Sequence, residues 1–152
     1  MTKEYMMQVF QMDKQVQKLS ERLEYLKFQQ TKPTSSQIGL GVQTSRNITS
    51  AQDLTIKVLE AEEALNKAVE QLTQLEWEIV QAYAPLSPRQ KAIIIWRYIC
   101  RLPWKEIAKR AKLSEMQVMR IHNTSLDILA ENKNRQTQGL PNSLSDRHFN
   151  PL

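Results

Sequence analysis

Six side chains with hydrogen-bonding or thioether groups lie within nine residues of one another: Glu115, Met116, Gln117, Met119, Arg120 and Asn123. Arg120 can form a bidentate pair with guanine, and Asn123 or Gln117 can do so with adenine. Met116 can contact the methyl group of thymine, and Glu115 can accept from the amino group of cytosine. This set of side chains therefore predicts recognition of base edges in double-stranded DNA.

Four basic side chains come shortly before this stretch: Lys105, Lys109, Arg110 and Lys112. Lysine and arginine neutralise DNA phosphates and release counterions, which gives affinity without sequence specificity. Taken singly, each of these residues is more often a solvated surface charge. As a group beside the base-reading candidates, they are expected to contact phosphates.

Two short helices and a turn would have to hold these side chains outward. Pro103 suits the first position of a helix, because its missing N–H would have no partner there. Trp104 and Ile107 begin an inner face with helical spacing, which Ala108 and Ala111 continue. Lys112-Leu113 then makes a turn. The pattern predicts a short first helix.

The second helix starts at Ser114, which can cap it, with Gln117 at the capping-box position. Its predicted apolar stripe consists of Val118, Ile121 and Leu129, with Ser125 and Leu126 at the margin. Two short helices across a tight turn are typical of a helix-turn-helix, whose second helix enters the DNA major groove. The alternative is an ordinary helical hairpin inside a core.

A further helix is predicted before Pro103. Pro85 breaks the preceding helix, and Ser87 and Gln90 have capping-box spacing around Pro88, which suits a first turn. Residues 92–96 are apolar almost all round, so this helix should be the buried centre of a small domain.

Several segments resemble region four of bacterial sigma factors, which reads the −35 promoter element: Leu86-Ser87-Pro88-Arg89-Gln90, Arg97-Tyr98, Trp104-Lys105-Glu106-Ile107-Ala108, Gln117-Val118-Met119-Arg120-Ile121 and Leu126. The resemblance covers about residues 85–130 without gaps. With the helices ahead of it and Val42-Gln43-Thr44-Ser45, the whole chain resembles small transcriptional regulators of the ArpU/RinA type. Such regulators are encoded by phages and prophages of low-GC Gram-positive bacteria.

The chain also departs from sigma factors. It has no counterpart of the aromatic-rich region that melts promoter DNA, so it should not be a complete sigma factor. Glu115, Met116 and Met119 occupy positions that are often basic in sigma factors, so the sigma promoter element cannot be carried over. Lys112 stands in the turn where many helix-turn-helix proteins have glycine.

The N-terminal half has two long apolar seams without Gly or Pro. Their residues alternate at spacings of four and three, as in the a and d positions of a coiled coil: Tyr5, Val9, Met12, Val16, Leu19, Leu23 and Leu26, then Leu54, Val58, Ala61, Leu65, Ala68, Leu72, Leu75, Ile79 and Ala82. Residues 31–50 are rich in Thr and Ser and hold two of the three glycines, so they are expected to form a loop. The simplest prediction is an antiparallel coiled-coil hairpin.

A dimer is also expected. Apolar residues beyond the seams would add surface for a second copy: Met6, Met7, Phe10, Leu59, Val69 and Trp77. The alternatives are a self-sufficient monomeric hairpin and seams that pair between subunits.

Charge divides the chain in two. Residues 1–84 hold nine Lys and Arg against eleven Asp and Glu, a net charge of −2, whereas residues 85–152 hold twelve against five, a net charge of +7. The basic excess therefore coincides with the helix-turn-helix candidate, which favours a nucleic-acid partner.

Other functions have little support in the sequence. The two histidines, His122 and His148, and the lone Cys100 have no metal-site spacing, and no phosphate-binding loop or nucleophile motif is present. We therefore expect no enzyme, no cofactor and no metal. Without a long apolar run or signal segment, we expect no membrane contact and a location in the bacterial cytoplasm.

These patterns predict an all-α protein with a coiled-coil hairpin over 1–84, a helix-turn-helix domain over 85–132 and a disordered tail over 133–152. The expected function is sequence-specific binding of double-stranded DNA upstream of phage late genes, as a homodimer, with host RNA polymerase as a further candidate partner. One alternative is a DNA-packaging recognition subunit like a phage small terminase. Another is an adaptor that binds RNA polymerase or a sigma factor and never DNA alone.

Overall fold

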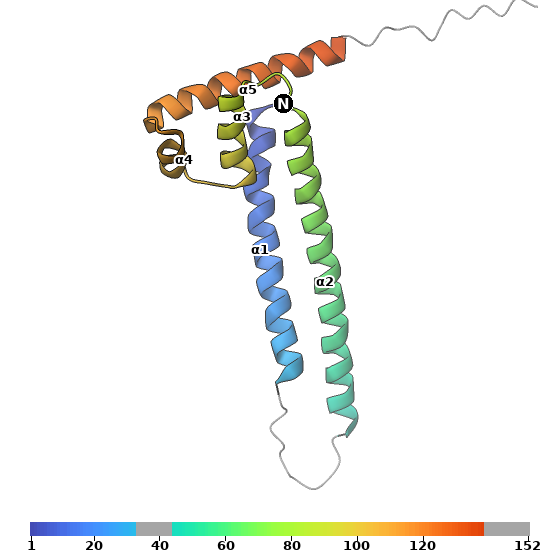
Figure 1. Cartoon of the computed structure of the whole chain (residues 1–152). Helices are drawn as coiled ribbons and strands as arrows, with labels where there is room; N and C mark the ends of the chain where they lie inside the picture. Colours follow the sequence, from blue (N-terminus) through green and yellow to red (C-terminus); the bar gives the residue numbers. More distant parts are fainter. Residues whose placement is uncertain (33–43, 139–152) are drawn as a thin grey trace, which may run out of the picture. The chain divides into compact units, whose positions relative to one another are not determined.

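The computed structural model describes residues 1–32 and 44–138, with side chains for 1–32 and 49–135. Over these residues every regular element is helical, which confirms the all-α prediction (Figure 1). The elements are α1 (Lys3–Thr31), α2 (Thr44–Gln81), α3 (Pro88–Ile94), the π-helix η1 (Ile95–Ile99), α4 (Trp104–Ala111) and α5 (Glu115–Gln138). None of the described helices is long and apolar enough to cross a membrane.

The chain divides into two compact units. Residues Met7–Glu78 form one, called here the hairpin unit, and Met1–Met6 together with Ile79–Leu152 form the other, the C-terminal unit. The first six residues thus belong with the helix-turn-helix segment, far from them in sequence.

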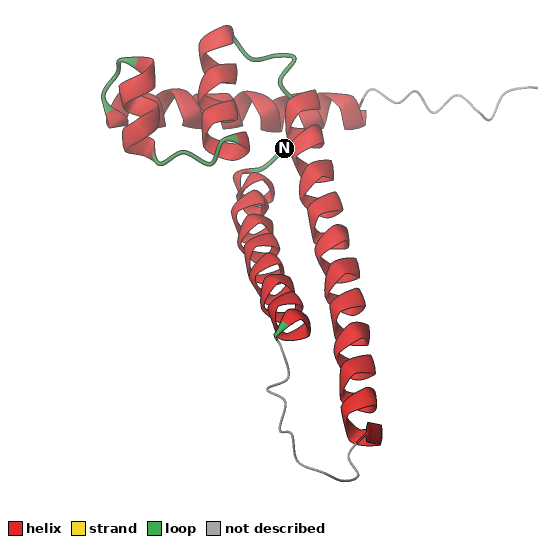
Figure 2. Ribbon diagram, turned by 60° about the horizontal axis from the view of Figure 1, so that its bottom comes forward, coloured by secondary structure: helices red, strands yellow, loops and turns green. Residues whose placement is uncertain are grey.

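In the hairpin unit, α1 and α2 lie side by side and run in opposite directions, as the views in Figures 1 and 2 agree. The seam residues of both helices are buried or half-buried, while most positions between them are exposed. Leu26 packs with Val58 and Ala61, and Leu23 and Leu54 lie against this cluster. The antiparallel hairpin is confirmed, and its seams face one another within a single chain.

Polar contacts flank this seam near its far end. The Lys27 Nζ lies 2.7 Å from Glu62 Oε1, and the Gln30 side-chain amide donates to Thr55 Oγ1 over 3.3 Å. Both pairs are exposed. Their contribution to stability is small, because exposed ion pairs contribute about 0–1 kcal/mol.

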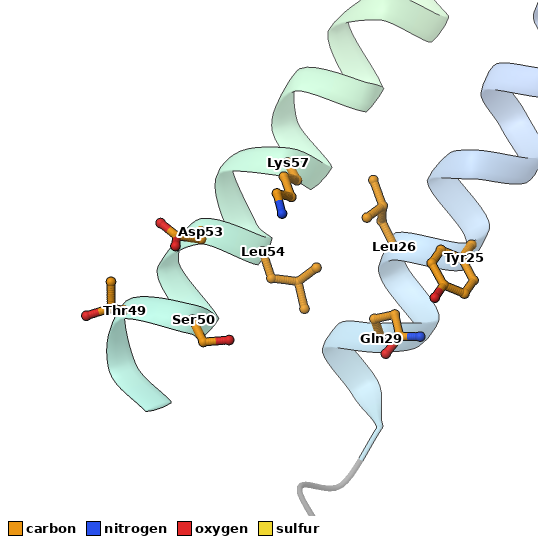
Figure 3. A pocket seen from close by; sticks show the side chains of 8 residues that line it. All are labelled: Tyr25, Leu26, Gln29, Thr49, Ser50, Asp53, Leu54 and Lys57. Carbon is orange, nitrogen blue, oxygen red and sulfur yellow. The ribbon is translucent and has the colours of Figure 1, made fainter. Parts of the chain in front are cut away.

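The far end of the hairpin has an open hollow of about 570 Å³ between α1 and α2. Figure 3 shows Leu26 and Leu54 facing each other across it, while Thr49 and Asp53 point away from α1. The hollow is thus the open end of the apolar seam, and its lining brings together no group of side chains suited to catalysis.

Two boundaries differ from the sequence prediction. Helix α2 begins at Thr44, inside the segment 31–50 predicted as a loop, because the last helix breaker of that segment is Gly41. Helix α5 continues to Gln138, inside the predicted tail. The remaining parts of the predicted loop and tail, residues 33–43 and 139–152, lie outside the described residues.

The apolar residues expected to lie beyond the seams differ in their exposure. Met7, Leu59, Val69 and Trp77 are exposed, and Phe10 is half-buried. Met6 has no exposed surface, so its assignment to an external apolar surface was wrong. Its position belongs to the C-terminal unit, whose packing the heptad spacing of α1 does not reveal.

Candidate nucleic-acid interface

Helix α3 starts as the sequence predicts. The Ser87 backbone N–H donates to Gln90 Oε1 over 2.9 Å, and the Gln90 N–H donates to Ser87 Oγ over 3.4 Å. These two bonds form a capping box, with Pro88 at the first helical position. Ile93 and Ile94 are completely buried, which confirms this helix as the centre of the small domain.

The helix then widens into the π-helix η1, a feature that the sequence pattern did not predict. The Cys100 N–H donates to the Ile95 carbonyl and the Leu102 N–H to the Trp96 carbonyl, both over 2.9 Å. Arg101, between these donors, adopts a left-handed backbone with φ of 57°. The chain thereby turns into Pro103, which is the N-cap of α4 rather than its first residue.

Helix α4 packs against the same core and ends in the predicted turn. Ile107 and Ala108 are buried in a cluster with Ile93 and Val118. Lys112 closes the helix with φ of 54° and ψ of 43°, the left-handed conformation that glycine adopts most easily. Lys112 therefore has the backbone conformation that glycine usually adopts at this position, and its Cβ makes that conformation less favourable.

Helix α5 begins with a second capping box. The Ser114 N–H donates to Gln117 Oε1 over 3.0 Å, and the Gln117 N–H donates to Ser114 Oγ over 3.2 Å. The predicted cap is confirmed. The side-chain oxygen of Gln117 already accepts a hydrogen bond from the backbone of Ser114. Gln117 is therefore a weaker candidate than Arg120 for a bidentate pair with a base.

The six base-reading candidates share the exposed side of α5 in its first three turns: Glu115, Met116, Gln117, Met119, Arg120 and Asn123. Met116 is 73% exposed. Val118 points inward and is completely buried. The surface of this helix end is thus free to enter a groove, and these DNA contacts remain predictions.

The Ser125 and Leu126 side chains are more deeply buried than predicted. Both were placed at the margin of the stripe, but Ser125 has no exposed surface and Leu126 has 8%. The Ser125 hydroxyl donates to the Ile121 carbonyl over 2.7 Å, so its burial leaves this polar group satisfied.

The four phosphate candidates Lys105, Lys109, Arg110 and Lys112 are all exposed on α4 and the turn. The Arg110 Nε lies 3.4 Å from Glu106 Oε1 within α4. Both side chains of this pair are about half exposed, so the pairing is weak and would not prevent a phosphate contact.

Sequence reasoning missed a buried polar cluster beneath α5. His122 is only 2% exposed, and its Nε2 lies 2.9 Å from the Tyr98 hydroxyl. The edge of its ring meets Trp104, at 4.8 Å between centroids. The Arg97 guanidinium lies 4.5 Å from the centre of the Trp104 ring and donates to the Leu102 carbonyl over 3.0 Å. The heptad-like spacing of Val118, His122, Ser125 and Leu129 was the signal that could have found this inward histidine.

Burial sets the protonation of this cluster. Desolvation lowers the pKa of His122, the nearby positive charges of Lys3 and Arg97 lower it further, and the hydrogen bond with Asn123 opposes them. Desolvation also raises the pKa of Tyr98 to about 12, despite the charge of Arg97. At neutral pH both groups are therefore uncharged, as their apolar surroundings require.

The first residues of the chain complete the C-terminal unit. The Met1 amino group donates to the Leu129 carbonyl over 3.0 Å, and burial lowers its pKa, with a smaller effect from Lys133. Thr2 Oγ1 accepts from the Tyr5 N–H over 3.3 Å, so Thr2 caps the start of α1. A hollow of about 290 Å³ separates this segment from α5, with Lys3 on one side and Asn123 and Asp127 on the other.

Among the described residues, no group of three His, Cys, Asp or Glu side chains is placed to hold a metal ion. Cys100 is exposed and free.

The family described as Sigma-70, region 4, matches residues 82–131. The match covers α3, η1, α4 and most of α5, so these elements form a DNA-binding helix-turn-helix domain of the sigma region four type. Such a domain is regulatory and not catalytic. No curated protein and no solved structure matches the chain.

Proposed function

We propose that this protein is a sequence-specific regulator of transcription that binds double-stranded DNA. In this proposal it is an ArpU/RinA-type activator of phage or prophage late genes. The observation that carries the proposal is the exposed face of α5 between Glu115 and Asn123, within a segment that matches sigma region four. Arg120 reads guanine from this face, and Met116 contacts a thymine methyl group.

The basic side chains of α4 and the turn hold the domain on the duplex. Lys105, Lys109, Arg110 and Lys112 are exposed immediately before the reading helix, where the first helix of a helix-turn-helix crosses the DNA backbone. They supply affinity that is independent of sequence, and the side chains of α5 supply discrimination.

The hairpin joins two copies in this proposal. Met7, Leu59, Val69 and Trp77 provide exposed apolar surface on α1 and α2, which a second copy would cover. A dimer would read two half-sites separated by about one helical turn or a multiple of it. Footprints that show single half-sites at every protein concentration would contradict this part.

Salt dependence tests DNA binding directly. With about five phosphate contacts, the logarithm of the affinity for duplex DNA should fall with the logarithm of salt concentration with a slope of roughly −4.5. Replacing the four basic residues of α4 and the turn by glutamine should flatten this slope by roughly 0.9 for each phosphate that the protein no longer neutralises.

The matched control removes the same charge from the hairpin at four exposed lysines: Lys14, Lys18, Lys57 and Lys67. Equal weakening by both quadruple variants would mean that net charge alone attracts DNA, and the proposed interface would then be wrong.

One observation favours a second candidate, an adaptor that binds RNA polymerase or a sigma factor through the hairpin. Between Asp53 and Glu78, helix α2 carries seven acidic and two basic residues, and Ile56, Leu59, Val69 and Trp77 are exposed among them. Such acidic and apolar side chains suit a partner with a basic surface. Absence of any DNA binding at low salt would favour the adaptor.

A further inference from the structure

We propose that the buried Tyr98–His122 pair fixes the amide of Asn123, so that Asn123 presents only hydrogen-bond donors to DNA. This inference rests on the proposed DNA-binding function and assigns a base preference to one position of the reading helix. His122 acts in it as a positioning residue, and Asn123 makes the contact.

The geometry links the core of the domain to its surface. His122 Nε2 lies 2.9 Å from the Tyr98 hydroxyl, and His122 Nδ1 lies 3.2 Å from Asn123 Oδ1. Tyr98 and His122 are buried, whereas Asn123 is exposed. The two hydrogen bonds therefore form one chain from η1 through the ring to the outer side of α5.

The positions of the protons follow from the acceptors. An amide oxygen can only accept, so Nδ1 of His122 must carry the hydrogen that it donates to Asn123. A neutral imidazole with a proton on Nδ1 has a free lone pair on Nε2, which accepts the hydrogen of the Tyr98 hydroxyl. In both hydrogen bonds the donor then lies on the side of the core and the acceptor on the side of the surface.

The surroundings keep the ring neutral and fixed. Positive groups face it from two elements, Lys3 on α1 and Arg97 on η1, and Trp104 of α4 packs against it at 4.8 Å between ring centroids. The Tyr98 ring stacks on it at 5.7 Å. No carboxylate is among the groups whose charge acts on His122, so an imidazolium would lack a counter-ion there.

The consequence concerns the exposed end of Asn123. With Oδ1 held by His122, the amide NH₂ group is directed away from the ring. It can donate to O6 and N7 of guanine or to O4 of thymine, whereas adenine presents an amino group beside N7 and cytosine presents an amino group alone. The inference thus replaces the expected pair of Asn123 with adenine by a preference for the keto bases guanine and thymine.

Selection of duplexes from a random pool, followed by affinity measurements on single-base variants of the selected site, tests this. Asn123→Ala first identifies the position that the residue reads, since preference is lost there. At that position the unaltered protein should favour guanine or thymine over adenine and cytosine by about fivefold, the value of one neutral hydrogen bond. A preference for adenine or cytosine would overturn the inference.

Variants then separate positioning from general stability. His122→Phe keeps an aromatic ring at this position but removes the hydrogen bond to the Asn123 amide. The preference for keto bases should then disappear, while the salt dependence of binding stays unchanged. Ser125→Ala, a control at an equally buried polar residue of α5, should keep the preference. If His122→Phe does not fold, Tyr98→Phe removes the hydroxyl that donates to Nε2, and with it the hydrogen bond that keeps the proton of His122 on Nδ1. An unchanged preference in a folded variant would overturn the inference.

A measurement without DNA distinguishes failure of this inference from failure of the proposed function. Nitrogen-15 NMR of the full chain should show His122 with a proton on Nδ1 and none on Nε2. The opposite tautomer would reverse the chain of donors and overturn the inference, whether or not the protein binds DNA. The predicted tautomer in a protein that selects no sequence would instead contradict the proposed function.

Discussion

The hairpin unit and the C-terminal unit are both helical, but they are stabilised in different ways. Helices α1 and α2 bury one narrow seam, and many of its side chains, such as Leu19 and Leu65, remain half-exposed. The C-terminal unit completely buries Ile93, Ile107 and Val118 from three different helices. Repetition thus specifies the first unit, whereas a few particular residues specify the second.

The two units also differ in backbone regularity. In the hairpin unit, the described backbone consists of two long helices. The C-terminal unit includes a π-helix and the left-handed residues Arg101 and Lys112. Such irregular segments are frequent where a fold positions functional side chains. Here they bring α4 and α5 together with the reading face outward.

The largest expected difference between the two units is the loss of stability when one apolar side chain is truncated in each. Ile107→Ala should lower the free energy of unfolding by about 2–5 kcal/mol, because it leaves a cavity among completely buried side chains. Leu19→Ala in the half-exposed seam should cost only about 1 kcal/mol, since it removes less buried apolar surface. Chemical denaturation of both variants measures this. Equal costs would contradict the contrast in packing.

Acid should weaken the C-terminal unit through His122. The pKa of His122 is lower in the folded protein than its ordinary value of 6.5, so the unfolded chain binds the proton more readily. The contribution of His122 to stability should therefore be constant above about pH 7 and fall as the pH drops through 6.5 toward the folded pKa; the Met1 amino group, with a pKa lowered from 8.0, adds a slope that begins at higher pH. The slope for one proton cannot exceed about 1.4 kcal/mol per pH unit.

Thermal unfolding across this pH range provides the measurement. His122→Phe should reduce the slope between pH 7 and pH 5, whereas His148→Gln, at the other histidine, should leave it unchanged. A slope that is unchanged in His122→Phe would assign the titration to other groups.

The smallest expected effect concerns the turn before the reading helix. Lys112→Gly should stabilise the protein by about 1 kcal/mol, because glycine adopts the left-handed conformation without a Cβ clash. Lys109→Gly, at an exposed position inside α4, should destabilise it by about the same amount. Destabilisation by both substitutions would argue against the left-handed turn.

Local patterns predicted much of this structure because they depend on residues close together in sequence. The spacing of the seam residues predicted the hairpin. The pairs Ser87-Gln90 and Ser114-Gln117 predicted two capping boxes, which the structure confirms. The wrong or missing features depend on distant contacts. Met6 is buried in a unit that joins Met1–Met6 to residues from Ile79 onward, and His122 is held by Tyr98, 24 residues away.

The site was predictable to a similar degree. Helical spacing placed five base-reading candidates on the outer side of α5, and the structure shows these five and Gln117 exposed: Glu115, Met116, Met119, Arg120 and Asn123. Spacing could not reveal that the oxygens of Gln117 and Asn123 already accept hydrogen bonds within the protein. Those bonds alter which bases the two amides can read.

The central claim is that the exposed face of α5 reads a DNA sequence. Selection of bound duplexes from a random pool, with the unaltered protein and with Arg120→Ala, tests it most directly. The unaltered protein should enrich one sequence, and Arg120→Ala should lose the preference for guanine at a single position, by about 1–3 kcal/mol, with the other positions unchanged. Failure to enrich any sequence, or uniform weakening at all positions in Arg120→Ala, would contradict the claim.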